Sequence, residues 1–377
     1  MEGNTKSVPA GAGHGRITDE AVAELRERIG VERPLNSQYH EYAGPDAIRH
    51  FAHGIGDVNP LWTDPEHGAA SAYGTNIAPP CFLCSCGMPR SVGLPGVHAL
   101  YTGSSWKFER PVRVGERIHT STRLAELSEK EGRYAGRQFL EVDEAIYRND
   151  AGETLATLRS HCMRGERDRA RSKGKYDDLK AASYTPEEID AIAAECAAEE
   201  IRGADPRHWE TVKSGDELPQ VVKGPLTVTD MNGWLLGWGG MFIRPHGIGH
   251  RWRGRHPAAY TLDARGVPDV PERVHWDTEF AQRSGLPAPY DYGPQRIAWL
   301  AQVFTNWMGD DGRLAELEVE VRRLNLVGDT TWCRATVTGC RLEGERGLVE
   351  CALRAENQRG EETAKGRALV ELPRRPR

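Results

Sequence analysis

Residues 61–80 read LWTDPEHGAASAYGTNIAPP, and residues 274–293 read VHWDTEFAQRSGLPAPYDYG. The two stretches align without a gap at a constant offset of 213 positions, from Asp64 to Asp277. The same offset relates the VRVGERIHTSTRL segment around Gly115 to the LNLVGDTTWCRATV segment around Gly328. Similarity at a fixed offset is typical of an internal repeat. The sequence therefore predicts a duplicated domain, in which Trp62 corresponds to His275 and Pro80 to Gly293.

Each repeat continues with the same order of elements. A helix candidate follows, CFLCSCGM (81–88) in the first half and PQRIAWLAQVFTNWM (294–308) in the second. Segments rich in β-prone residues come next, and each half carries an Asn-x-x-Gly-Glu hairpin signal, at 149–153 and at 357–361. This order predicts an α+β fold in which an antiparallel sheet curves around a central helix.

The sequence also suggests where the halves begin and end. Residues 1–16 are expected to form a disordered lead-in, and the first domain is placed at 17–168. A linker at 169–183 contains part of a basic run, and the second domain is placed at 184–377. Its first helix is predicted within 184–203, where Thr-Pro-Glu-Glu provides a start signal. A Gly-, Arg- and His-rich insertion is placed at 237–273, and long loops of this kind are often functional.

Composition excludes several classes of protein. The chain has 377 residues, a net charge of −6, 38% hydrophobic and 28% charged residues, which is a globular balance. The sequence lacks the clustered basic face that nucleic-acid binding requires. It also lacks an apolar run of the kind that predicts a membrane helix or a secretory leader. A cytoplasmic protein with reduced thiols is expected. Neither the cysteines of CFLCSCGM nor the histidines of the insertion have a recognised metal-ligand spacing, so no metal site is predicted.

The motifs of the first half point to a family. FAHGIGDVNPLWTDPEHGAASAYGTNIAPP (51–80) resembles the MaoC-like, or R-specific, enoyl-thioester hydratases and dehydratases. SSWKFERPVRVGERI (104–118) resembles the N-terminal dehydratase module of fatty-acid synthases. The resemblance covers most of 35–165 and 205–372 and implies a double hotdog fold. It further implies a lyase of fatty acid metabolism that reversibly hydrates a 2-enoyl thioester, or dehydrates a 3-hydroxyacyl thioester, without a cofactor.

The family's catalytic parts are divided between the halves. In the first half, Asp57 and Asn59 match the family's catalytic Asp and its supporting Asn. Trp62 replaces the His, and an indole cannot accept or carry a proton. Pro80 replaces the helix-entry Gly, whose N–H would bind the thioester oxygen. In the second half, His275 and Gly293 occupy the family positions, but the ungapped register puts Val270 and Glu272 where Asp and Asn are expected.

We therefore expect the chemistry in the second half, with a carboxylate supplied by Asp263, Asp269, Glu272 or Asp291. A composite site of Asp57 with His275 is the alternative, and a purely structural His275 is a further one. The predicted catalytic set is His275, Asp57, Asn59 and Gly293, and the predicted substrate-binding set is Trp62, Asp277, Tyr290, Asp291, Arg251 and Arg253. The two arginines suit the phosphates of coenzyme A or of a carrier-protein arm. Asp64 and Asp277 could instead cap the short helices that follow them.

Two other functions fit the same scaffold. One is a thioesterase or a lyase acting on an unusual acyl substrate, and the other is a non-catalytic acyl-binding subunit. The expected partner in every case is an acyl-CoA or acyl-carrier-protein thioester. Because two halves within one chain already form the basic hotdog pair, either a monomer or a homodimer is expected.

Overall fold

The computed structural model describes residues 16–36, 38–89, 93–94, 97–132, 136–165 and 179–375. Nearly all of the lead-in predicted at 1–16, and most of the linker predicted at 169–183, lie outside these residues. Within the described chain no helix is both long enough and apolar enough to span a bilayer.

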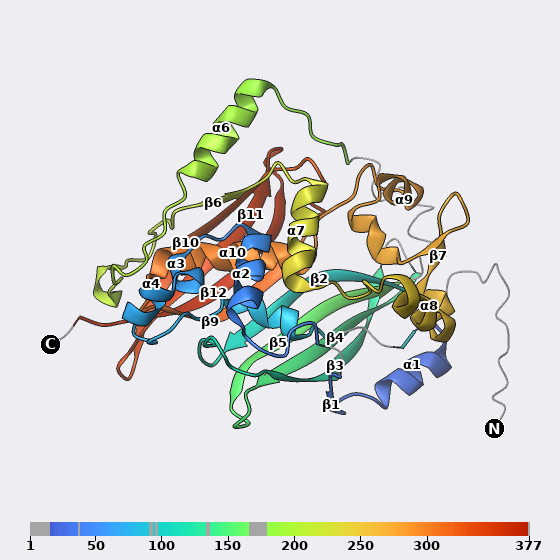
Figure 1. The fold of residues 1–377 in the computed structure, drawn as a ribbon, viewed down its shortest axis with the longest axis horizontal. Helices are drawn as coiled ribbons and strands as arrows, with labels where there is room; N and C mark the ends of the chain where they lie inside the picture. The colour runs from blue at the N-terminus through green and yellow to red at the C-terminus, as the bar shows by residue number, and fades with distance from the viewer. Residues whose placement is uncertain are drawn as a thin grey trace.

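One antiparallel sheet of ten strands runs through the molecule (Figure 1). Its order is β1-β3-β4-β5-β2-β9-β12-β11-β10-β6, so the strands of the first half occupy one side and those of the second half the other. The strands are β1 (Arg33–Pro34), β2 (His98–Phe108), β3 (His119–Gly132), β4 (Gly136–Arg148), β5 (Thr154–Gly165), β6 (Val221–Lys223), β9 (Arg313–Val321), β10 (Thr331–Glu343), β11 (Arg346–Asn357) and β12 (Glu362–Leu372). A separate hairpin consists of β7 (Thr261–Leu262) and β8 (Pro268–Asp269).

The two halves meet where β2 pairs with β9. The register runs from Gly103 opposite Glu320 to Lys107 opposite Glu316. At Gly103 the backbone has a φ of 144°, and an added Cβ would lie 2.1 Å from the carbonyl oxygen of Val319. Only glycine permits that close approach. The predicted α+β double hotdog is confirmed, with the two hotdog sheets continuous across this junction.

The helices lie mainly against the concave side of the sheet (Figure 1). They are α1 (Asp19–Arg26), α2 (Pro45–Ile55), α3 (Pro60–Thr63), α4 (Pro65–Ala70), α6 (Pro186–Ala197), α7 (Val228–Trp238), α8 (His246–Arg255), α9 (Thr278–Arg283) and α10 (Gly293–Met308), with 3-10 helices η1 (Pro80–Cys86), η2 (Trp209–Thr211), η3 (Pro257–Ala259) and η4 (Pro271–His275). Helix α10 is almost wholly buried and packs against strands of both halves.

The central helix is long only in the second half. Its counterpart η1 in the first half is a buried 3-10 helix of seven residues. Pro79 and Pro80 precede it, and Gly87 ends it with a φ of 127°. Pro89 then disfavours helical backbone at the residue before it, so the helix cannot continue. The expectation of a long helix in each half is therefore correct for 294–308 and wrong for 81–88.

Local signals read from the repeat are confirmed. Asp64 caps α4 and Asp277 caps α9, each through its side chain. Asn149 and Asn357 accept backbone N–H bonds within the turns of their hairpins. Thr185 caps α6 with a capping box, as its Thr-Pro-Glu-Glu start predicts.

The two halves differ by the insertion. Gly56 and Gly239 are equivalent left-handed residues that end α2 and α7, at an offset of 183 positions, whereas Asp64 and Asp277 are 213 apart. The extra residues therefore lie between Gly239 and Asp277. They include α8, η3 and the β7–β8 hairpin, which come before η4.

Candidate active site

A cavity of about 330 Å³ opens in front of the second-half turn. Its walls come from both halves of the chain. Met88, Pro89 and the start of β2 contribute one side, and Trp238, η4 and the N-terminus of α10 contribute the other. Most of this lining is apolar, and the polar groups gather around His275 and Glu272. A cavity of this kind is the usual form of a small-molecule site.

His275 lies at the end of η4 and faces this cavity. Its Nδ1 lies 2.8 Å from the carbonyl oxygen of Tyr290. Because a carbonyl can only accept, Nδ1 carries the proton, and Nε2 keeps a lone pair. The imidazole also stacks on the Tyr292 ring, with centroids 3.8 Å apart. Burial lowers the pKa of His275 to about 4, so the ring is neutral at pH 7 and Nε2 can act as a base.

Glu272 supplies a carboxylate to the same cavity. It is buried, and it accepts hydrogen bonds from the backbone N–H groups of Met241 (3.1 Å) and Phe242 (2.8 Å). The Tyr292 hydroxyl donates to it at 3.3 Å. Tyr292 thus contacts Glu272 through its hydroxyl and His275 through its ring. Sequence reasoning missed Tyr292, although its place directly before the helix-entry Gly293 was a signal.

The helix-entry position has the geometry expected of an oxyanion site. Gly293 is the first residue of α10 and lines the cavity. N–H groups in the first turn of a helix have no partner within the helix, and the helix dipole favours negative charge there. A Cβ at Gly293 would lie 2.2 Å from the Tyr101 ring of β2. The first half therefore packs directly on the end of this helix.

The other candidate carboxylates have different roles. Asp291 lines the cavity, but its carboxylate is held in a buried ion pair by Arg296, with Arg296 Nε at 2.7 Å. Asp263 accepts turn N–H groups and binds Arg265 in the exposed β7–β8 hairpin. Asp269 is half exposed, 3.9 Å from Arg273. The cap at Asp277 lies outside the cavity lining. Asp291 is therefore held in an ion pair and Asp277 caps α9, while their substrate-binding roles stay predictions.

The ungapped register also needs correction before Asp277. Pro271 opens η4 as Pro60 opens α3, so Val270 is equivalent to Asn59 by its position before the helix. The second-half turn is then two residues longer than the first-half turn. Residues 57 and 240 both follow the left-handed glycine that ends α2 or α7. The aspartate is replaced there by Gly240, whose added Cβ would lie 3.4 Å from Glu272 Oε1.

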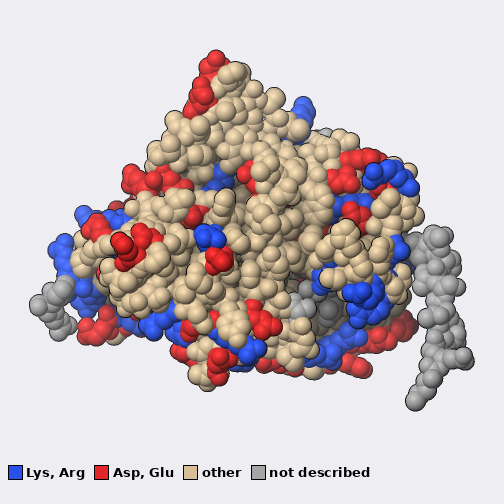
Figure 2. All heavy atoms as spheres, in the orientation of Figure 1, with Lys and Arg blue, Asp and Glu red and all other residues tan. Residues whose placement is uncertain are grey.

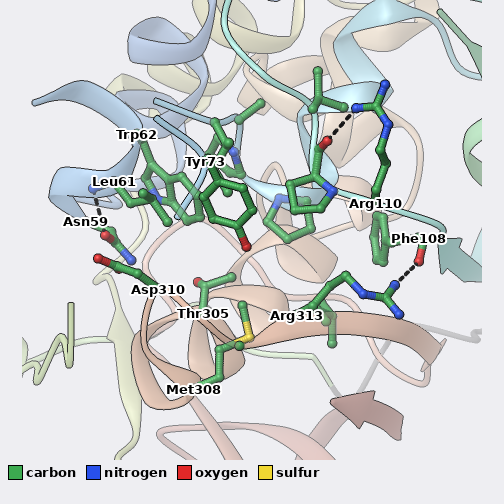
Figure 3. A pocket seen from close by; sticks show the side chains of 18 of the residues that line it. Asn59, Leu61, Trp62, Tyr73, Phe108, Arg110, Thr305, Met308, Asp310 and Arg313 are labelled. Carbon is green, nitrogen blue, oxygen red and sulfur yellow. Dashed lines mark hydrogen bonds between the residues drawn. The ribbon is translucent and has the colours of Figure 1, made fainter. Parts of the chain in front are cut away.

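The first-half turn keeps the family's Asp and Asn, but the cavity beside it is small (Figure 3). Asp57, Asn59 and Trp62 are buried, and the cavity beside them measures about 40 Å³. Trp62 Nε1 donates to Asp57 Oδ2 at 2.9 Å, and the Asn59 backbone N–H donates to Oδ1 at 3.0 Å. The Asn59 side chain caps α3. In Figure 3 the Trp62 and Tyr73 rings lie on the side of the cavity next to Asn59.

His275 lines the second-half cavity, whereas Asp57 lines neither cavity and its neighbours Asn59 and Trp62 line the smaller one. This arrangement does not favour the composite site.

The predicted phosphate-binding arginines lie on α8. Arg251 is exposed and Arg253 is half-buried, and neither lines the cavity. Figure 2 shows Lys and Arg side chains gathered over this helix. Phe242, four residues before α8, lines the cavity, so this end of the helix lies close to the cavity wall. Among the described residues no group of three or more His, Cys, Asp or Glu side chains is placed to hold a metal ion.

Relatives of known sequence match about a third of the chain. A UPF0336 protein from Parafrankia sp. is 31% identical over 135 residues, and the match spans 85% of that protein and 33% of this chain. One from Saccharopolyspora erythraea is 30% identical over 140 residues, spanning 85% of that protein and 35% of this chain. The chain belongs to the UPF0336 family. Residues 38–158 of this family member also match the FAS1-like dehydratase domain region.

Solved structures extend the likeness to both halves. A MaoC-like dehydratase aligns with a TM-score of 0.64 and 21% identity, covering 93% of this chain and 99% of that one. A putative MaoC domain dehydratase from Chloroflexus aurantiacus gives 0.60 and 11%, covering 98% and 100%. A conserved hypothetical protein from Mycobacterium tuberculosis, described as a double hotdog, gives 0.53 and 13%, covering 91% and 96%. The resemblance to the MaoC-like dehydratases is confirmed in the fold and in the dehydratase region.

Proposed function

We propose that this protein hydrates a 2-enoyl thioester, or dehydrates the corresponding 3-hydroxyacyl thioester, at the second-half cavity. The observation that carries the proposal is the arrangement of Glu272, His275 and Gly293. A carboxylate, a neutral imidazole and a helix N-terminus line one largely apolar cavity. These are the three parts that addition of water to an enoyl thioester needs.

Glu272 takes the place of the lost aspartate. In the first half, the Asp57 carboxylate follows Gly56 directly and accepts the N–H of Asn59, the third residue after that glycine. In the second half, Glu272 approaches from η4 and accepts the N–H groups of the second and third residues after Gly239. The carboxylate is therefore held over equivalent backbone, although it comes from a different position of the sequence.

The reaction follows from these positions. A water molecule held by Glu272 and His275 loses a proton to His275 Nε2 as its oxygen bonds to C3 of the enoyl group. The electron pair of the C2–C3 double bond moves toward the thioester carbonyl, and the developing oxyanion accepts the Gly293 N–H. The imidazolium then returns its proton to C2, so that one water has been added. Dehydration is the same path in reverse.

The acyl group is proposed to arrive on coenzyme A or on a carrier-protein arm. Arg251 and Arg253 on α8 provide positive charge that suits the phosphates of either carrier. Tyr290 is proposed to orient the site, because its carbonyl fixes the His275 tautomer and its ring packs edge-on against the imidazole.

The test follows the ultraviolet absorbance of enoyl-CoA substrates of several lengths with wild type, His275→Ala and Asp57→Asn. We expect the absorbance to fall with wild type and Asp57→Asn, and His275→Ala to reduce kcat by about 10²–10⁴-fold. Loss of activity in both folded variants would favour the composite site instead.

Two other results would overturn the proposal. Release of free thiol without loss of the enoyl absorbance would indicate a thioesterase. Tight acyl-CoA binding without turnover would indicate a binding subunit.

A further inference from the structure

Val97 and the start of β2 form one wall of the second-half cavity. Val97, Ala99, Leu100 and Tyr101 all line it. Tyr101 packs against Gly293 and so marks the end where the thioester oxygen would bind. An extended chain advances at most about 3.3 Å per residue, so Val97 lies at most roughly 13 Å from Tyr101. These residues therefore measure the depth of the cavity from the reacting end.

Val97 also belongs to a second, smaller hydrophobic core. The members of this core are Ile17, Val22, Leu25, Leu94, Val97, Leu124, Leu127 and Phe139. Val22 and Leu25 come from α1, which lies before the first hotdog repeat, and both are almost fully buried. Val97 is 8% exposed, so the far end of the wall is backed by packed side chains.

The chain next to Val97 is held on two sides. Leu25 lies against Gly93, where an added Cβ would be 2.9 Å from Leu25 Cδ1. From the sheet, Arg164 donates to the carbonyl oxygens of Gly93 and Leu94, each at 3.1 Å. Arg164 is itself buried and forms an ion pair with buried Glu141 at 2.5 Å. A buried arginine held in this way fixes the backbone and gives the core a defined position.

We propose that this α1 core closes the far end of the cavity and limits the substrate to medium-length acyl chains, with Ala99 and Val97 determining the limit. The inference rests on the proposed function for the identity of the ligand. An extended chain spans about 3.5 Å per three bonds, so about 13 Å accommodates roughly eleven bonds. Ala99 is exposed and lines the cavity, so a larger side chain there would take up open space.

The experiment measures binding of saturated acyl-CoAs with four to sixteen carbons by calorimetry, because these probes need no turnover. With wild type, affinity is expected to rise about fourfold per methylene up to roughly ten carbons and then to level off. Ala99→Leu should weaken decanoyl-CoA binding at least tenfold and leave butyryl-CoA within twofold. Val97→Ala should move the plateau to longer chains. Lys107→Leu, an exposed site on the same strand, is the matched control and should not change the profile.

Three results would overturn the inference. The first is affinity that keeps rising to sixteen carbons, the second is an Ala99→Leu variant that weakens all lengths equally, and the third is a protein that binds none of the probes. The proposed function is tested separately with the matching enoyl-CoAs. If the protein does not hydrate enoyl-CoAs but the length profile is as expected, the hydratase proposal fails and the closed cavity stands. If the protein hydrates them but Ala99→Leu leaves the length profile unchanged, the closed cavity fails and the hydratase proposal stands.

Discussion

The first-half and second-half turns occupy equivalent places in the fold, yet the cavities in front of them measure about 40 and about 330 Å³. In the first half, Trp62 satisfies the Asp57 carboxylate with an N–H bond that a histidine could also make. The indole therefore keeps the structural part of the pair and loses the proton-transfer part. In the second half the imidazole remains, and Gly240 stands at the position of the aspartate. The first-half turn is therefore packed into the core, whereas His275 and Glu272 of the second half line an open cavity.

The largest expected difference between the turns concerns their carboxylates. Glu272→Gln should lower kcat about 100-fold or more, because the water loses its anionic partner. Asp57→Asn should leave kcat within about threefold. Both are measured from the enoyl absorbance, with circular dichroism to verify folding. A Glu272→Gln variant with full activity would contradict the assignment, and Tyr292→Phe, which removes only one donor to Glu272, should have a smaller effect.

Trp62 tests whether the first-half turn contributes to stability rather than to catalysis. Trp62→Ala should reduce the free energy of unfolding by about 3–5 kcal/mol, since a buried aromatic side chain and its bond to Asp57 are lost. Urea denaturation measures this change. The folded variant should keep its kcat, and a loss of kcat under conditions where the protein stays folded would revive the composite site. Trp62→His should create no second active site, because Pro80 offers no N–H.

Gly293 and Pro80 test how the two halves differ at the N-terminus of the central helix. Gly293→Ala brings a methyl group against the Tyr101 ring, and overpacking of this kind costs about 1–3 kcal/mol. We expect kcat to fall about tenfold as the N–H shifts from the oxyanion. Tyr101→Ala in the same chain should relieve the clash and recover part of the stability. Pro80→Gly in the first half should leave kcat unchanged, and a rise in kcat there would show that the first turn can still act.

The pH dependence of His275 gives the smallest effect. Its folded pKa is about 4, below the ordinary value of 6.5, because burial disfavours the imidazolium. The unfolded chain therefore binds a proton first, so stability from this group is complete above pH 6.5 and is lost as pH falls toward 4. At pH 5 the loss should be about 1 kcal/mol for a partly exposed ring. His275→Gln should remove that share of the urea-midpoint shift. The acid limb of kcat/KM should lie near pH 4, and a limb near 6.5 would contradict a neutral, half-buried ring.

Sequence alone determined the duplication and the local structure of each half. Asp64 and Asp277 as caps, and Asn149 and Asn357 in hairpin turns, all follow from side chains acting on backbone a few residues away. Such interactions have the same geometry wherever they occur, so their spacing can be read directly. The family resemblance and the repeat also predicted His275 and Gly293 as site residues, and both line the second-half cavity.

Only the tertiary structure shows what surrounds each candidate carboxylate. Glu272 was one of four candidates, and it is held by the backbone of Met241 and Phe242 some thirty positions earlier. Asp291 is paired instead with Arg296, which binds in turn the carbonyl oxygen of Thr363. The packing of Tyr101 on Gly293 and the core behind Val97 likewise join distant segments. Contacts of this kind depend on how the sheet brings the two halves together, because no local pattern records which distant group a buried charge will meet.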